Sequence, residues 1–141
     1  MTLKSIFING AWLAAGDGAE RDITNPASQT VIETVSYGGE ADAQAAVEAA
    51  HAAFAGWNAR PVYERAGFLQ RMAAAIRANQ EQLARTLTME VGKPLPEAGG
   101  EIGAAADQFE WYAEEVKRAA GDVIPPRMAD RRHFTLRHPV G

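Results

Sequence analysis

The chain has 141 residues, a formal net charge of -4 and no cysteine. That length allows one ordinary domain or a piece of a larger one. The missing cysteine excludes disulfides, thiolate zinc sites and a cysteine nucleophile within these residues, and the mildly acidic balance argues against nucleic acid as the main partner. No apolar run approaches the roughly 18 residues of a membrane span, and Met1–Ser5 starts no secretory signal. We therefore expect a cytoplasmic protein without a membrane partner.

The apolar composition is unusual because it rests on alanine. Hydrophobic residues make up 47% of the chain, and 29 of them are alanines. Leucine, isoleucine, valine and phenylalanine together number only 27 of 141, which is close to the roughly 20% below which an independent core becomes difficult to build. We therefore expect the chain to need a partner or further polypeptide.

The first 36 residues carry strand and turn signals. Asn9-Gly10 lies between two β-prone stretches and predicts a hairpin turn in which both central residues have positive φ. Asp17-Gly18 predicts a second turn, Asn25-Pro26 starts another, and Val31–Val35 is a strand candidate. This region therefore predicts a small antiparallel meander.

Four helices are predicted next, because apolar residues recur at spacings of three and four. The first begins near Glu40 and ends at Gly56, and the second has Pro61 in its first turn. Asn79 is a candidate N-cap for the third helix, which Gly92 closes. The fourth helix is predicted to open at Pro94 and Pro96 and to stop at Gly121, which makes the chain a mostly helical α+β unit.

The last segment predicts a strand that has no obvious partner. Pro125-Pro126 forms an extended link, and His133–Arg137 alternates between polar and apolar residues. A single terminal strand needs another strand to pair with. The first meander, another subunit or a continuation of the chain could supply it.

Few residues indicate a catalytic or ligand-binding site. The three histidines lack metal-ligand spacing, so surface or structural roles are favoured over a metal site. Gly92-Lys93-Pro94 lacks the glycine spacing and the hydroxyl of a phosphate loop, which favours a helix end followed by a helix start. Four arginines between positions 127 and 137 have no aromatic stacking pattern beside them, so a solvated or interfacial strand face is favoured over nucleic-acid contact.

Glu90 is placed where a helix disfavours it. It lies in the last turn of the predicted third helix, and the helix dipole disfavours an anion there by a few tenths of a kcal/mol. Pairing with Lys93, simple solvation, and a cation held between Glu90 and nearby carbonyls all remain open. No catalytic triad, dinucleotide loop or paired-carboxylate motif is present, so the residues alone reveal no active site.

Several motifs, taken in order, resemble the aldehyde dehydrogenase superfamily. They are Phe7–Trp12, Thr24–Ala27, Ala53–Trp57 with Glu64-Arg65, and Glu90–Leu95 with Glu97–Ile102. The later stretch is most similar to the succinate-semialdehyde dehydrogenase branch, through Phe109–Arg118, Gly121–Pro125 and Ala129–Arg132. One departure is Ser28-Gln29, which stands where members often have Thr-Gly. If that turn needs a positive φ, Gln29 costs roughly 1 kcal/mol relative to glycine.

The resemblance implies an α/β fold and a division of the chain. Residues 1–130 would form the N-terminal part of the NAD(P)-binding domain, with a hairpin and helices packed against a Rossmann-like sheet. Residues 131–141 would be the first strand of an oligomerisation arm. The full-length enzyme would be a homo-oligomer, a dimer or tetramer.

The resemblance also implies an activity for the full-length enzyme. It would oxidise an aldehyde, with succinate semialdehyde as the expected substrate, to the carboxylic acid. A thiolate attacks the aldehyde, a hydride leaves to NAD or NADP, and a glutamate-activated water hydrolyses the thioester. Those catalytic and cofactor-binding residues belong to later segments of the family, so none is expected here, and the isolated chain is expected to be inactive.

Two minor roles follow from the resemblance. Thr24, through its carbonyl, and Glu90 occupy the positions of a structural monovalent cation site. Gly100 and Ala104 occupy positions that face the substrate tunnel, where small residues leave room for substrate. The alternative for Gly100 and Ala104 is that they merely allow close helix packing.

Two rival interpretations remain. The chain could be a non-catalytic interaction module, such as a truncated subunit that docks on a full-length enzyme through Phe134 and its neighbours. It could also be a free-standing helical adaptor unrelated to dehydrogenases.

Overall fold

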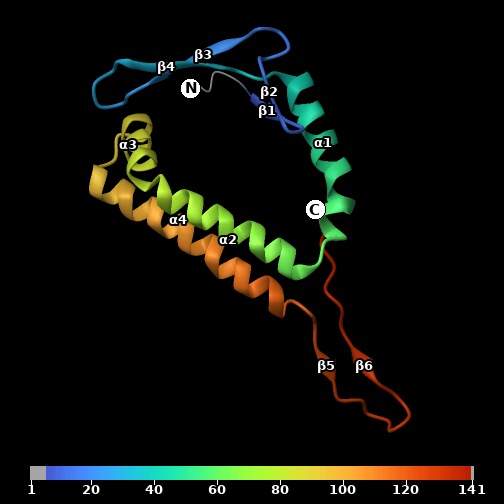
Figure 1. Ribbon diagram of the computed structural model, residues 1–141. Helices are drawn as coiled ribbons and strands as arrows, with labels where there is room; N and C mark the ends of the chain where they lie inside the picture. Colours follow the sequence, from blue (N-terminus) through green and yellow to red (C-terminus); the bar gives the residue numbers. More distant parts are fainter. Residues whose placement is uncertain (1–5, 141) are drawn as a thin grey trace.

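The computed structural model describes residues 6–140 as two β-hairpins, four helices and a third hairpin (Figure 1). The sequence expectations that fall on Met1–Ser5 and Gly141 lie outside the described residues. In chain order the elements are β1 (Ile6–Ile8), β2 (Ala11–Leu13), β3 (Glu20–Thr24), β4 (Val31–Ser36), α1 (Glu40–Asn58), α2 (Val62–Ala78), α3 (Gln80–Val91), α4 (Leu95–Glu115), the 3₁₀ turn η1 (Val116–Arg118), β5 (Val123–Ile124) and β6 (His133–Phe134).

The N-terminal strands form two separate antiparallel pairs, β1–β2 and β3–β4, so the prediction of one meander is wrong. The Asn9-Gly10 turn is confirmed, with φ of 50° and 80° at its two residues. The link between β2 and β3 is hydrogen-bonded to the start of α1, and this keeps the two strand pairs apart. The backbone N–H of Gly16 donates to both carboxylate oxygens of Asp42 at 3.2 Å. The same carboxylate accepts the N–H of Gly39 at 2.9 Å, which ties the link to the start of α1.

The four predicted helices are all present, with some different ends. Helix α1 runs two residues beyond Gly56, because that glycine keeps helical geometry. Asn79 lies at the predicted start of α3, yet its side chain donates from Nδ2 to the carbonyl of Ala75 at 2.8 Å and does not cap α3. Gly92 closes α3 as predicted, in the left-handed conformation with φ of 78°.

Helices α2, α3 and α4 pack together (Figure 1), and the buried residues at their contacts are alanines. The buried residues of these helices are Ala66, Ala73, Ala84, Ala98, Ala106 and Ala113. No large side chain among the described residues is fully buried. Between α2 and α4, Arg77 donates to Asp107 at 2.8 Å and to Glu110 at 2.7 Å. These two hydrogen bonds raise the pKa of Arg77, but such exposed pairs contribute little stability.

The chain exposes far more surface than a compact protein of its size. Its accessible area is 10714 Å², whereas area scaling gives roughly 7,100 Å² for a compact monomer of 15.1 kDa. Helix α1 has no buried residue. Figure 1 shows that α1 runs apart from the α2–α4 pair. Strands β3 and β4 extend beyond one end of α1 and beyond one end of the α2–α4 pair. The helices therefore present faces that nothing in the described chain covers.

The C-terminal segment forms an arm of two short strands (Figure 1). The predicted strand over 133–137 is reduced to β6, which pairs with β5 in the register Val123↔Phe134 and Ile124↔His133. Its partner is therefore a segment of the same chain that we did not predict as a strand, because two residues carry no periodicity. At the base of the arm Gly121 has φ of 109°, and a side chain there would clash with the carbonyl oxygen of Thr135.

We predict that Ala73→Leu destabilises the helical pack by about 1–3 kcal/mol, because Ala73 is fully buried and the larger side chain must force the helices apart. The matched control is Ala74→Leu, since Ala74 is the exposed neighbour on the same helix and should change the free energy of unfolding by less than about 0.5 kcal/mol. Urea unfolding followed by circular dichroism measures both. Equal effects would contradict the alanine contact described here.

Candidate functional site

The turn between β3 and β4 has a defined backbone. The side-chain oxygen of Asn25 accepts the N–H groups of Ala27 at 2.9 Å and Ser28 at 3.3 Å. Gln29 has φ of 60°, so the positive φ on which the sequence expectation depended is present. Its side chain donates from Nε2 to the carbonyl of Pro26 at 2.8 Å, which offsets part of the strain.

This turn packs on the end of α3 at Gly92. A Cβ atom on Gly92 would lie only 2.8 Å from Cγ of Pro26, and the φ of 78° independently favours glycine there. Pro26 is two residues after Thr24, and Gly92 is two residues after Glu90. The fold thus brings the neighbourhoods of both predicted cation ligands to one place.

Glu90 itself is exposed, and the suggested pairing with Lys93 is not observed. Lys93 pairs instead with Glu101 on α4. The residues present offer oxygen ligands of the kind that hard cations bind, because the end of a helix leaves carbonyls without helical partners next to the Glu90 carboxylate. Within residues 6–140 no group of three or more His, Cys, Asp or Glu side chains could hold a metal ion. A cation here would therefore depend on backbone carbonyls, and the roles of Thr24 and Glu90 stay predictions.

Gly100 and Ala104 lie on the exposed face of α4, opposite its buried alanines. A Cβ atom on Gly100 would meet nothing within 4 Å, so the described residues make no close helix contact at Gly100, and both interpretations of Gly100 and Ala104 stay predictions. Trp111, which is 65% exposed, follows Ala104 after two turns of the same face. This face of α4 is therefore open, and it carries Gly100 and Ala104 beside the exposed polar residues Glu97 and Gln108 and the ring of Trp111.

Close approach to α4 occurs instead at two other glycines. The side chain of Gln80 donates from Nε2 to the carbonyl of Gly99 at 2.9 Å, and a Cβ atom on Gly103 would lie 3.4 Å from that nitrogen. No role for Gly99, Gly103 or Gln80 is predicted from the sequence. Only the spacing of the two glycines on one helix could have indicated this contact.

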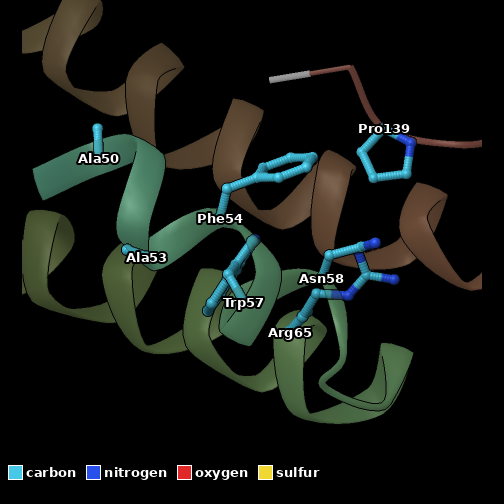
Figure 2. Close-up of a pocket in the computed structure, with 7 residues that line it drawn as sticks. All are labelled: Ala50, Ala53, Phe54, Trp57, Asn58, Arg65 and Pro139. Atoms are coloured by element: carbon cyan, nitrogen blue, oxygen red, sulfur yellow. The ribbon is translucent and has the colours of Figure 1, made fainter. Parts of the chain in front are cut away.

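A cavity of about 280 Å³ lies at the end of α1 (Figure 2). Its apolar side is formed by Phe54 and Trp57, and the ring of Trp57 packs edge-on against Phe68 with centroids 5.4 Å apart. Figure 2 shows the guanidinium of Arg65 beside the side chain of Asn58, with Pro139 above them. The sequence placed Phe54 on a helical stripe, but nothing in its pattern indicated that the C-terminal segment returns to this point.

A family profile described as "Aldehyde dehydrogenase family" matches residues 12–141. The chain belongs to the aldehyde dehydrogenase family. This confirms the superfamily that the ordered motifs resemble. No helix of the described aldehyde dehydrogenase segment is both long and apolar enough to cross a membrane.

Two curated relatives illustrate the similarity. The chain is 45% identical over 138 residues to 3-sulfolactaldehyde dehydrogenase of Pseudomonas putida, which covers 98% of this chain and 28% of the relative. It is 43% identical over 138 residues to the NADP(+) succinate-semialdehyde dehydrogenase of Escherichia coli K12, covering 98% of this chain and 29% of the relative. The chain therefore spans somewhat more than a quarter of the length of the curated relatives it matches.

Solved structures show the same arrangement of elements. Succinate-semialdehyde dehydrogenase from Burkholderia pseudomallei matches with a TM-score of 0.91 and 43% identity, over 97% of this chain and 28% of that one. Betaine aldehyde dehydrogenase from Staphylococcus aureus, solved with NAD+, matches with a TM-score of 0.88 and 29% identity, over 95% of this chain and 28% of that one. The helices and hairpins thus form a piece of the aldehyde dehydrogenase fold.

We predict that Gly92→Ala destabilises the chain by about 2 kcal/mol or more, because it adds left-handed strain and a clash with Pro26. The control is Gly56→Ala, where helical backbone and open space should make alanine stabilising by about 0.5–1 kcal/mol. The midpoints of thermal unfolding compare the two. A neutral Gly92→Ala would show that Pro26 does not pack on α3.

Proposed function

We propose that this chain works as the N-terminal part of an NAD(P)-dependent aldehyde dehydrogenase and is inactive alone. The observation that carries the proposal is the excess of exposed surface, which is 10714 Å², with alanines as the only buried residues between positions 6 and 140. Such a chain has faces that require further polypeptide, as the coverage of 28% to 29% of its relatives also suggests. In this proposal the thiolate, the hydride acceptor and the activated water are supplied by the rest of the enzyme.

The proposed substrate class is an aldehyde that also carries an acidic group, with succinate semialdehyde as the specific choice. Relatives named for succinate semialdehyde, glutarate semialdehyde and 3-sulfolactaldehyde support that choice. Gly100 and Ala104 would form part of the tunnel wall, where the absence of bulky side chains leaves room for the aldehyde. Their exposed, open face on α4 supports this role.

We propose that residues 131–141 contribute to an arm through which copies of the enzyme associate in the cytoplasm. The support is the exposure of apolar side chains in this segment, with Phe134 at 66% and Leu136 at 63%. A hairpin of two short strands is marginal alone and offers unpaired edges to another chain. Residues 1–130 would then belong to the NAD(P)-binding domain, with Thr24 and Glu90 holding a structural monovalent cation.

A chimera tests both the proposed function and the proposed tunnel. In it, this chain replaces the matching segment of the Escherichia coli succinate-semialdehyde dehydrogenase. We expect the chimera to reduce NADP+ with succinate semialdehyde, whereas the 141-residue chain alone shows no turnover above a heat-killed control. Ala104→Phe in the chimera should raise KM about tenfold or more, because the ring would fill the tunnel.

The size control is Ala129→Phe, which adds the same ring to an exposed turn of the arm. It should leave KM unchanged, and unchanged thermal midpoints should show that both variants fold. Turnover by the isolated chain would contradict its dependence on further polypeptide. An unchanged KM for Ala104→Phe would remove that residue from the tunnel.

A further inference from the structure

A second cavity, of about 370 Å³, lies at the base of the arm and is lined by basic groups. It is formed where the start of α2, the turn η1 and the C-terminal segment meet. Four of its lining residues are Arg65, Lys117, Arg137 and His138, and none of the described residues that line it is an aspartate or glutamate. The first and last of these residues, Arg65 and His138, are 73 positions apart in the sequence.

Arg65 is the decisive residue, because its Nε is buried and has no hydrogen-bond partner among the described residues. A guanidinium presents five N–H donors in a fixed fork and stays charged at any ordinary pH. An N–H donor that is shielded from water and left without an acceptor is unfavourable, so the Nε of Arg65 favours an acceptor at this place. The same side chain also lines the cavity at the end of α1 (Figure 2), so Arg65 borders both cavities.

The neighbouring charges leave the cavity net positive. Lys117 donates to both carboxylate oxygens of Glu114, at 2.9 and 3.0 Å, and this pairing lowers the pKa of Glu114. Arg118 is paired with Glu115 at 2.6 Å and does not line the cavity. Arg137 has no ion pair among the described residues. Arg65 and Arg137 therefore remain as two uncompensated cations, and Asn58 adds a neutral amide at the same wall.

We propose that this basic cavity binds a small oxyanion, a phosphate or carboxylate group held mainly by Arg65 and Arg137. Arginine suits this chemistry because its fork matches both groups with two parallel hydrogen bonds. The proposal does not depend on aldehyde oxidation, since it concerns only groups of this chain. A bound oxyanion would link α2 to the C-terminal segment and fix the base of the arm.

Nuclear magnetic resonance of the ¹⁵N-labelled 141-residue chain tests the proposal. The chain is titrated with sodium phosphate and, separately, with sodium acetate. Sodium chloride at equal ionic strength is the control. We expect saturable shifts of amides around Arg65, Lys117 and Arg137, with half-saturation on the order of 1 mM phosphate. Acetate shifts at the same amides would assign the site to carboxylates as well. Response to phosphate alone would assign it to phosphate.

Two variants decide which groups bind. Arg65→Gln and Arg137→Gln should each weaken phosphate binding about tenfold or more. Because Arg137 lies in an exposed irregular segment, its substitution does not destabilise a helix. The control is Arg85→Gln, which removes an exposed arginine paired with Glu81 outside the cavity and should leave binding unchanged. Absence of saturable shifts, or equal binding by all three variants, overturns the proposal.

Discussion

The packing of α2 on α4 through alanines is the contact on which the rest of the chain depends. Small side chains let two helices approach closely, yet they bury little apolar area because an alanine removes only one methyl group from water. The buried positions Ala66, Ala73, Ala98, Ala106 and Ala113 therefore set the geometry of the pair without supplying a large core. Several larger apolar residues of these two helices, among them Tyr63, Phe68 and Trp111, are exposed and remain available to another surface.

Backbone contacts at glycines and one carboxylate then position the segments around that pair. Asp42 ties the link between the N-terminal hairpins to the start of α1. Gly92 lets Pro26 lie on the end of α3, and Gly121 lets the arm fold back at Thr135. Each contact needs a close backbone approach rather than a buried side chain. This explains how a chain with a thin core can still present the open face of α4 in a defined place.

Much of the helical part could be predicted from the sequence, because the four apolar stripes are local signals, although Gly56 and Asn79 do not act as the predicted end and cap. The Asn9-Gly10 turn and the helix end at Gly92 were likewise predictable, since both need a positive φ. The independent pairs β1–β2 and β3–β4 were not, because the bond from Gly16 to Asp42 spans 26 positions. The strand β5 was too short to show periodicity. The meeting of Pro26 with Gly92 could be inferred only through the family resemblance, and the Arg65 cavity was not signalled at all.

Amide hydrogen exchange tests most directly whether the exposed helices await further polypeptide. In the 141-residue chain we expect the amides of α1, which has no buried residue, to exchange at least tenfold faster than those in the middle of α2 and α4. In the chimera, where the rest of an enzyme is present, the protection of α1 should rise to that of α2. Equal protection of α1 and α2 in the isolated chain would contradict the account, because it would show that the chain stabilises all its helices alone.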